Sequence, residues 1–261
     1  MRSAGGKSAK DLIWERVWII GASSGIGLEL ARQISSVSKT VFISARSEDK
    51  LVSLAGERDN IVPVPLDVTD EESVAEVVSN LTADGKSVDL VVVSSATWKP
   101  AKVTELQVAD FREVMETNYL AAVHVVSKLV PVMAGAGKGQ IGLIASVAGY
   151  RGLPNAGTYA PTKAALINFA ECIRPQLTQL GIAVSIINPG FVETPMTAVN
   201  KFPMPFLMKP EEAASRIIAG LENKSYEIAF PMRMVLLLKL ARLMPNRLFF
   251  WLVGKFMLKS S

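Results

Sequence analysis

The stretch Val17-Trp-Ile-Ile-Gly-Ala-Ser-Ser-Gly-Ile-Gly-Leu-Glu-Leu-Ala-Arg-Gln-Ile34 combines three local patterns in a row. A short apolar run typical of a buried strand is followed by a glycine-rich turn, Gly21 to Gly27, and then by an amphipathic helix. Glycine permits tight turns and a close backbone approach to a ligand, and the N–H groups and dipole of a helix start suit a pyrophosphate. The glycines alone are equally typical of a plain turn. Between a strand and a helix they favour a dinucleotide-binding unit.

Apolar runs and amphipathic stretches alternate along the rest of the chain. The expected strands are 17–20, 40–44, 61–65, 90–94, 140–145, 183–188 and 226–230, and the expected helices between them are 25–37, 48–55, 71–83, 108–134, 157–180 and 210–221. The strand interiors are nearly all apolar, as in parallel strands covered on both faces. The pattern predicts an α/β fold with a doubly wound, mostly parallel seven-stranded sheet and helices on both faces. No repeat or linker divides the 261 residues, so 1–261 is expected to be a single domain.

Tyr159 and Lys163 lie four residues apart in Tyr-Ala-Pro-Thr-Lys, thirteen residues after Ser146. Helical residues at this spacing share one face. An ammonium beside a phenol favours the phenolate and should lower the phenol pKa. The pair would then be a general acid/base able to work near neutral pH. Alone the pair arises often by chance, and its meaning depends on the glycine-rich turn upstream.

Six motifs in one order resemble the short-chain dehydrogenase/reductase family over roughly Val17 to Phe230. They are the glycine-rich turn, Asp67-Val68, Asn118, Ser146, Tyr159 with Lys163, and Asn188-Pro189-Gly190. The resemblance implies a Rossmann-type oxidoreductase with a nicotinamide cofactor. It also implies a homodimer or homotetramer, paired through the long helices near 108–134 and 157–180.

The resemblance implies four catalytic residues. Tyr159 would exchange a proton with the carbonyl or alcohol oxygen of the substrate, and Ser146 would hydrogen-bond the same oxygen. Lys163 would keep the phenol acidic and hold the nicotinamide ribose, and Asn118 would hold a water beside that lysine. Ser146 also has a structural reading, as a strand-end hydroxyl bonded to its own backbone, and for Asn118 a structural reading carries more weight.

The cofactor-binding residues implied by the resemblance come from all these motifs. Asp67 would bind the adenine amino group, and Thr194 the nicotinamide carboxamide. The full set is Gly21, Ser23, Ser24, Gly25, Ile26, Gly27, Arg46, Asp67, Val68, Ser94, Tyr159, Lys163, Pro189, Gly190, Val192 and Thr194. One departure is Ser94-Ser95-Ala96, where the family usually has Asn-Ala-Gly, and it should weaken binding near the adenosine ribose without changing the fold.

The end of the second strand, Phe42-Ile-Ser-Ala-Arg-Ser47, bears on cofactor preference. An NAD site needs a carboxylate about 20 residues after the glycines to bind the ribose hydroxyls. Here Ala45 takes that place and Arg46 follows. A guanidinium suits a 2′-phosphate, and Ser24 would assist, so the sequence predicts NADP(H) rather than NAD(H).

Substrate signals are fewer. Phe202, Phe206 and Leu207 lie in the Met-, Phe- and Pro-rich segment 195–209 and favour an apolar, adaptable pocket, although core packing also explains them. Arg151 is the cation placed to contact a charged group. The favoured function is an NADP-dependent carbonyl reductase or alcohol dehydrogenase acting on a hydrophobic ketone, aldehyde or secondary alcohol. The alternative is an NADP-binding scaffold or redox sensor without turnover, which the Asn, Ser, Tyr and Lys set disfavours.

The net charge of +4 is unevenly distributed. Residues 231–261 hold six Lys and Arg and no acidic residue, and subtracting those six charges leaves −2 on the remainder. Because the tail is also strongly apolar, it points to a membrane surface or a lipid-like substrate rather than to nucleic acid. Its expected helices, 232–244 and 246–258, are too short to span a bilayer. They would complete the core, form a subunit interface or make peripheral membrane contact through 232–259.

The single cysteine and single histidine limit other functions. Cys172 rules out an internal disulfide and fits a reducing, cytoplasmic compartment, and we expect it to be buried in a helix. With His124 as the only histidine, a metal site is not expected. Residues 1–12 should be a mobile leader, without the apolar centre of a signal peptide.

Overall fold

The computed structural model describes residues 12–200 and 203–256. Residues 1–11 of the expected leader, Phe202, Lys259 and residues 257–258 of the last expected helix lie outside the described residues.

Seven strands form one parallel sheet in the order β3-β2-β1-β4-β5-β6-β7. The predicted α/β fold is therefore confirmed, and every expected strand is present within a few residues of its expected ends. The strands are β1 Trp14–Ile20, β2 Ser38–Ser44, β3 Ile61–Pro63, β4 Leu90–Val93, β5 Gly139–Ile144, β6 Ile182–Pro189 and β7 Glu227–Phe230. The strand order reverses direction between β1 and β4, which is where ligands bind in sheets of this kind, outside the carboxyl ends of the strands.

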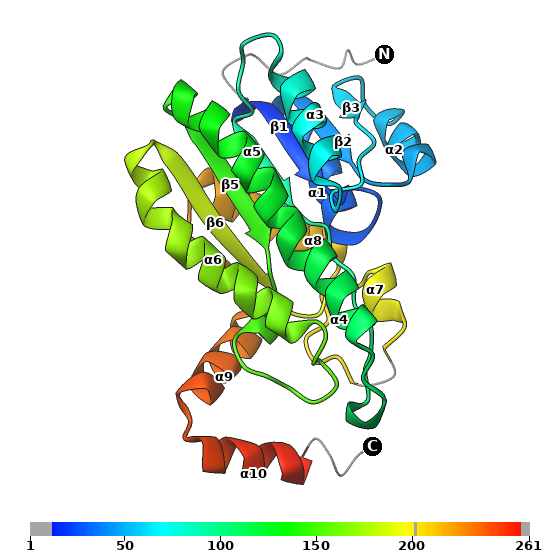
Figure 1. The fold of residues 1–261 in the computed structure, drawn as a ribbon, viewed down its shortest axis with the longest axis vertical. Helices are drawn as coiled ribbons and strands as arrows, with labels where there is room; N and C mark the ends of the chain where they lie inside the picture. The colour runs from blue at the N-terminus through cyan, green and yellow to red at the C-terminus, as the bar shows by residue number, and fades with distance from the viewer. Residues whose placement is uncertain (1–11, 201–202, 257–261) are drawn as a thin grey trace, which may run out of the picture.

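Helices cover both faces of the sheet, with a separate apolar core under each set (Figure 1). Helices α3 (Glu71–Thr82), α5 (Ala121–Ala136) and α6 (Ala160–Gln179) pack on one face. Helices α1 (Gly25–Ile34), α2 (Glu48–Ala55) and α8 (Pro210–Glu222) pack on the other. Successive β1 residues go alternately to the two cores, Trp18 to the first and Ile19 to the second. Burial on both faces explains why the strands are continuous apolar runs.

The helix expected at 108–134 consists of three parts. α4 (Val108–Met115) and α5 are joined by one wide π-helical turn, η3 (Glu116–Leu120), which contains Asn118. Turns of this type are often found at functional sites. By length and composition alone, the stretch Val108–Ala136 is the one helix in the described part of the chain that could cross a membrane; here it packs against α3 and the sheet.

Shorter elements complete the described chain. They are η2 (Val103–Glu105), η4 (Val147–Gly149), α7 (Pro195–Ala198), α9 (Met232–Leu243) and α10 (Asn246–Phe256). Figure 1 shows α9 and α10 at one end of the molecule, away from α2 and α3. The expectation of a buried Cys172 is wrong, because this thiol lies on the exposed side of α6.

Candidate active site

A cleft of about 430 Å³ opens at the carboxyl ends of the strands. It is lined by the loops that follow strands β1 to β6, which a parallel sheet brings to one edge. Of the residues expected to bind cofactor, all but Gly27 line it: Gly21, Ser23, Ser24, Gly25, Ile26, Arg46, Asp67, Val68, Ser94, Tyr159, Lys163, Pro189, Gly190, Val192 and Thr194. Ser146 also lines the cleft.

The glycine-rich turn is closed tightly enough to admit only glycine. Gly21 has φ +85° and Gly25 has φ +56°, in the left-handed region that other residues seldom adopt. A Cβ on Gly27 would lie 2.3 Å from the Gly21 carbonyl oxygen, and one on Gly21 would lie 2.7 Å from the Ser95 nitrogen. Gly27 therefore does not line the cleft, but its missing side chain lets α1 pack closely against the Gly21 carbonyl. The cradle that these glycines leave at the start of α1 fits the pyrophosphate of a dinucleotide.

The segment after β6 lies against this turn. A Cβ on Gly25 would lie 2.9 Å from Thr194 Cγ2, so the two halves of the chain meet at this point. Thr194 also caps α7, accepting from the Thr197 N–H in a capping box. On the other side, the Ser146 hydroxyl donates to the Pro189 carbonyl at 3.4 Å. The cleft is thus closed on one side by residues 189–197.

Ser146, Tyr159 and Lys163 are brought together as predicted. Ser146 is the N-cap of η4, where its Oγ accepts from the Ala148 N–H at 3.1 Å, and it hydrogen-bonds the Tyr159 side chain. Tyr159 is the N-cap of α6, and Lys163 follows one turn later. The Lys163 Nζ lies 5.4 Å from the centroid of the Tyr159 ring and donates to the Ile144 carbonyl at 2.8 Å. The lysine is only 1% exposed.

Burial dominates the protonation of this pair. It raises the pKa of Tyr159 to about 12, although the hydrogen bond from Ser146 acts in the opposite direction. Burial also lowers the pKa of Lys163 to about 7. The expectation that the lysine lowers the phenol pKa is therefore wrong here, because desolvation opposes the charged form of both groups. At neutral pH the phenol is protonated, which is the form that donates a proton.

Asn118 is not among the residues that line the cleft, where its neighbour Thr117 lies instead. The amide pairs with the backbone of Thr97: Oδ1 accepts from the Thr97 N–H at 2.7 Å and Nδ2 donates to the Thr97 carbonyl at 2.9 Å. Nδ2 also donates to the Thr162 hydroxyl at 3.1 Å. The structure thus gives Asn118 a bridging position between the loop after β4 and α6, which is its structural reading. Its relay role stays a prediction.

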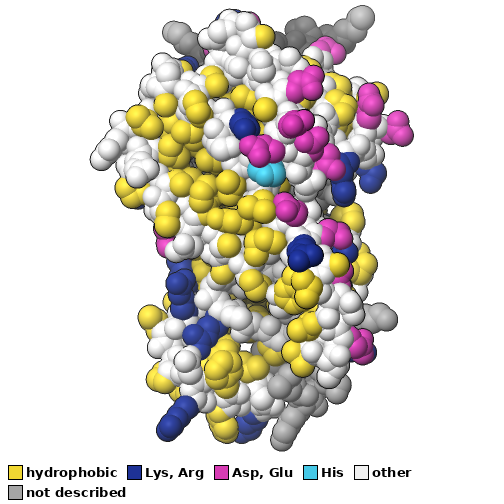
Figure 2. Space-filling model, in the orientation of Figure 1, with side chains coloured by type: hydrophobic (Ala, Val, Ile, Leu, Met, Phe, Trp, Pro, Cys, Tyr) yellow, Lys and Arg dark blue, Asp and Glu magenta, His cyan; other side chains and the backbone are white. Residues whose placement is uncertain are grey.

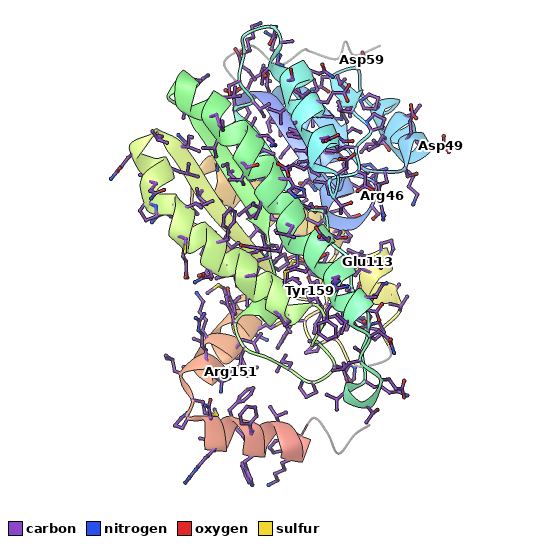
Figure 3. All side chains as sticks on the ribbon, viewed as in Figure 1. Arg46, Asp49, Asp59, Glu113, Arg151 and Tyr159 are labelled. Carbon is purple, nitrogen blue, oxygen red and sulfur yellow. The ribbon has the colours of Figure 1, made fainter. Side chains whose placement is uncertain are left out.

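The adenosine end of the cleft combines an acid with exposed cations. The Asp67 Oδ1 accepts from the Thr69 N–H and hydroxyl, while Asp70 caps α3. Arg46 lines the cleft from the loop after β2, and Figure 3 shows Asp49 directed away from it. Lys50 lines the same region and was not predicted. Its position in the first turn of α2, four residues after Arg46, was a usable signal.

Other sequence expectations for the substrate end do not hold. Phe206 and Leu207 are about half exposed and are not among the cleft-lining residues, whereas Met196 is. Arg151 does not reach the cleft; it donates to Asn246 Oδ1 at 2.7 Å and its guanidinium lies 4.3 Å from the Phe249 ring centroid. The apolar side chains that do line the cleft include Ile144, Val192, Pro195 and Met196.

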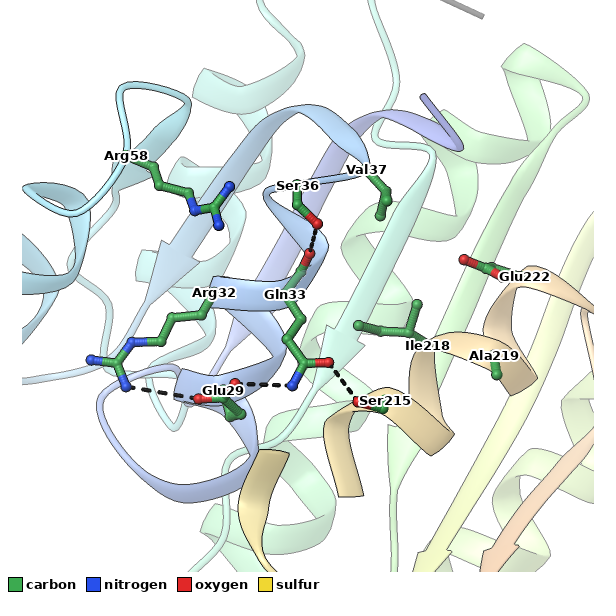
Figure 4. Close-up of a pocket in the computed structure, with 10 residues that line it drawn as sticks. All are labelled: Glu29, Arg32, Gln33, Ser36, Val37, Arg58, Ser215, Ile218, Ala219 and Glu222. Carbon is green, nitrogen blue, oxygen red and sulfur yellow. Dashed lines mark hydrogen bonds and ion pairs between the residues drawn. The ribbon is translucent and has the colours of Figure 1, made fainter. Parts of the chain in front are cut away.

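A second hollow of about 510 Å³ lies between α1 and α8 (Figure 4). Its polar groups are largely paired with one another: Gln33 donates to Glu29 and accepts from Ser215, and Arg32 lies near Glu29. This hollow contains none of the predicted site residues. No cluster of three or more potential metal-ligating side chains occurs within residues 12–200 and 203–256.

The parallel sheet, the glycine cradle and the Ser-Tyr-Lys group together define a dinucleotide-binding oxidoreductase. Comparisons with known proteins agree. The family model described as short chain dehydrogenase matches residues 15–202, and the chain belongs to this family. It is an NAD(P)-dependent short-chain dehydrogenase/reductase.

Relatives and solved structures extend the likeness beyond that segment. The chain is 32% identical over 243 residues to an uncharacterized oxidoreductase of Myxococcus xanthus, covering 92% of this chain and 96% of that one. It is 30% identical over 210 residues to an uncharacterized oxidoreductase of Staphylococcus haemolyticus, covering 80% and 91%. A crystal structure of a short-chain dehydrogenase from Streptomyces avermitilis has a TM-score of 0.81, at 23% identity, and covers 95% of this chain and 99% of that one. The structural match supports the fold alone.

Proposed function

We propose that the protein is an NADP(H)-dependent oxidoreductase that interconverts a hydrophobic ketone or aldehyde and the corresponding alcohol. The observation that carries the reaction type is the Ser146–Tyr159–Lys163 group in the lining of the cleft, in which the lysine is buried and the serine and tyrosine are half-buried. A bound nicotinamide nucleotide would supply or accept the hydride. Gly21, Gly25, Asp67 and Thr194 would hold it, since they line the cleft beside the glycine cradle.

The protein's own groups handle the proton and the oxygen atom. With its pKa near 12, the Tyr159 phenol is protonated at neutral pH and can donate to a carbonyl oxygen during reduction. Ser146 orients that oxygen through its hydroxyl. Lys163, with a pKa near 7, can carry its proton at neutral pH and stabilise negative charge that develops on the phenol. In the oxidative direction the phenolate is required, so that reaction should become faster as the pH rises.

Tyr159→Phe tests these roles. The substitution removes only the hydroxyl, so the variant should lose turnover by about 100- to 10,000-fold and keep its affinity for the nucleotide. Turnover is measured as NADPH consumption with a panel of apolar ketones and aldehydes. Nucleotide affinity is measured by fluorescence titration with NADPH. Undiminished turnover in the variant would refute the assignment. Tight nucleotide binding by the parent protein with no turnover of any panel member would favour the scaffold or sensor function.

Cofactor preference rests on the cations at the adenosine end. Ala45 leaves no carboxylate at the end of β2, and Arg46 and Lys50 are exposed at the cleft edge. Both cations suit the 2′-phosphate of NADP(H). A charge-assisted hydrogen bond contributes about 1.5–3 kcal/mol, so Arg46→Ala should weaken NADPH binding by about 10- to 100-fold and leave NADH binding little changed.

The matched control is Arg58→Ala, an exposed arginine of the same half of the chain that does not line the cleft. It should leave both affinities unchanged. Equal dissociation constants for NADH and NADPH in the parent protein would contradict the proposed preference, without bearing on Tyr159.

A further inference from the structure

The C-terminal helix pair, α9 and α10, exposes an unusual number of large apolar side chains. On α9 they recur at helical spacing along one side, opposite the buried Val235 and Leu238. On α10 only Phe249 is buried, while Phe250 is 64% and Trp251 57% exposed. The exposed set is Met232, Leu236, Leu237, Leu240, Leu243, Leu248, Phe250, Trp251 and Phe256. An exposed apolar surface of this extent marks an interaction site.

Positive charge is interleaved with these apolar residues. The described part of the tail, 231–256, contains five Lys and Arg and no Asp or Glu. Lys239 pairs with Glu227 of β7, and none of the other four has an ion pair among the described residues: Arg233, Arg242, Arg247 and Lys255. Figure 2 shows basic and apolar side chains side by side at this end of the molecule, with the acidic side chains gathered elsewhere.

This charge pattern distinguishes between the candidate partners. A symmetric interface between two copies would place the same cations opposite each other, with no acid in the patch to compensate. An anionic lipid surface complements them, because each Lys or Arg near such a surface is attracted and the apolar side chains enter the headgroup region. Trp251 suits this boundary particularly, since its ring prefers the membrane interface, and the Lys255 Nζ lies 4.9 Å from the Trp251 ring centroid.

We propose that α9 and α10 form a docking surface for the face of an anionic phospholipid membrane. The pair is joined to the catalytic body beside the site. Arg151, in the loop before Tyr159, binds Asn246 and the Phe249 ring of α10 (Figure 3). A Cβ on Gly190 would lie 2.8 Å from Met234 Sδ of α9. Docking therefore sets the substrate end of the molecule near the lipid. The proposal does not depend on cofactor preference or on turnover.

Vesicle co-sedimentation tests the proposal on the full chain. The parent protein should bind phosphatidylcholine vesicles that contain phosphatidylglycerol and bind pure phosphatidylcholine vesicles weakly, and added salt should release it. The double variants Phe250→Ser/Trp251→Ser and Arg247→Glu/Lys255→Glu should each lose about tenfold or more of this binding. Their side chains are exposed, so the variants should retain their melting temperature. The controls Val52→Ser and Lys39→Glu alter exposed residues far from the tail and should bind as the parent does.

Trp251 provides a direct reading of insertion. Of the four tryptophans, Trp14 and Trp18 are buried, Trp98 in the loop after β4 is half-buried, and Trp251 is exposed, so quenching by lipids brominated in the acyl chain should come mainly from Trp251. Trp251→Phe should keep vesicle binding and lose most of that quenching. Binding that is independent of anionic lipid, or that survives both double variants, would overturn the proposal. It would also be overturned if the double variants altered the sedimentation coefficient of the free protein without altering vesicle binding, because the tail would then join subunits.

Discussion

The burial of Lys163 makes the stability of the protein depend on pH. Its pKa falls from an ordinary 10.5 to about 7 in the folded state. Between these values the unfolded chain binds a proton that the folded chain lacks, so folding stability rises with pH across that window. Below about pH 7 both states are protonated, and the penalty for burying the charge is then constant.

Lys163→Met, which keeps the shape and removes the charge, should therefore show its largest stability advantage at pH 7 or below. The difference in the free energy of unfolding between the variant and the parent protein should decrease steadily as the pH approaches about 10. Urea unfolding at a series of pH values measures it. The control is Lys86→Met, since the Lys86 side chain is 65% exposed and should give a gap that hardly changes with pH. A pH-independent gap for Lys163→Met would show that the ammonium is not desolvated.

At the residue scale, the sequence predicted which site residues meet better than it predicted the pKa values of their side chains. The spacing of Ser146, Tyr159 and Lys163 predicted that they meet, and they do. It could not predict the sign of the phenol pKa shift, because that sign depends on how much water reaches Tyr159 and on the Ile144 carbonyl that engages Lys163. The Ile144 carbonyl lies at the end of β5, nineteen residues before Lys163, and only the folded chain brings the two together.

At the scale of secondary-structure elements, Glu227 joins three parts of the molecule. From β7 its carboxylate accepts from the Tyr150 hydroxyl at 2.6 Å, from Asn188 Nδ2 at 3.3 Å and from Lys239 of α9. Burial alone would raise the pKa of Glu227, but the Lys239, Tyr150 and Asn188 bonds outweigh it and hold the pKa below its usual 4.5. Stability from these bonds is thus present above about pH 4.5 and lost as the pH falls through the folded-state pKa.

Glu227→Gln should destabilise the protein at neutral pH by about 1 kcal/mol or less, because the group is partly screened by solvent. The difference should disappear on acidification, when the parent carboxylate is also neutral. Thermal unfolding over a pH series that descends from 7 to below the pKa of the folded-state Glu227 carboxyl measures this. Glu222→Gln is the control, as an exposed acid at the end of α8 with no ion pair among the described residues. If the stability difference between Glu227→Gln and the parent increased at acid pH, the proposal that the Glu227 pKa is lowered in the folded state would be contradicted.

Local pattern and long-range packing explain which elements could be predicted. Expected and observed bounds agree where the apolar period is marked, as for α2 at Glu48–Ala55, although its N-cap Ser47 makes no side-chain cap hydrogen bond. The π-helical turn at Glu116–Leu120 has no such signal, because its apolar pattern continues into α5. The exposure of Cys172 also depends on which side of α6 meets the sheet. The place of Cys172 within a predicted helix does not determine whether its side chain faces the sheet or the solvent.

At the scale of the whole molecule, the sheet order follows from the alternation of strands and helices, since right-handed crossovers allow few topologies. The assembly of subunits is a separate matter, because it depends on surfaces that a single chain leaves exposed. Most exposed side chains on the outer side of α6 are small and uncharged, namely Pro161, Ala164, Asn168, Cys172 and Pro175, with the charged Glu171 and Arg174 exposed towards the end of the helix. Figure 2 shows apolar side chains gathered on the face that α5 and α6 cover.

We propose that two copies pair through α5 and α6, so Asn168→Arg should separate them. A guanidinium placed on this side of α6 would be desolvated opposite its own symmetry mate, at a cost of about 2–5 kcal/mol. Sedimentation velocity should show a dimer or tetramer for the parent and a smaller species for the variant. Asn80→Arg, the same change on the exposed end of α3, should sediment as the parent does. Retained NADPH binding would show that Asn168→Arg still folds, and a parent that is monomeric, or a variant that stays paired, would place any contact elsewhere.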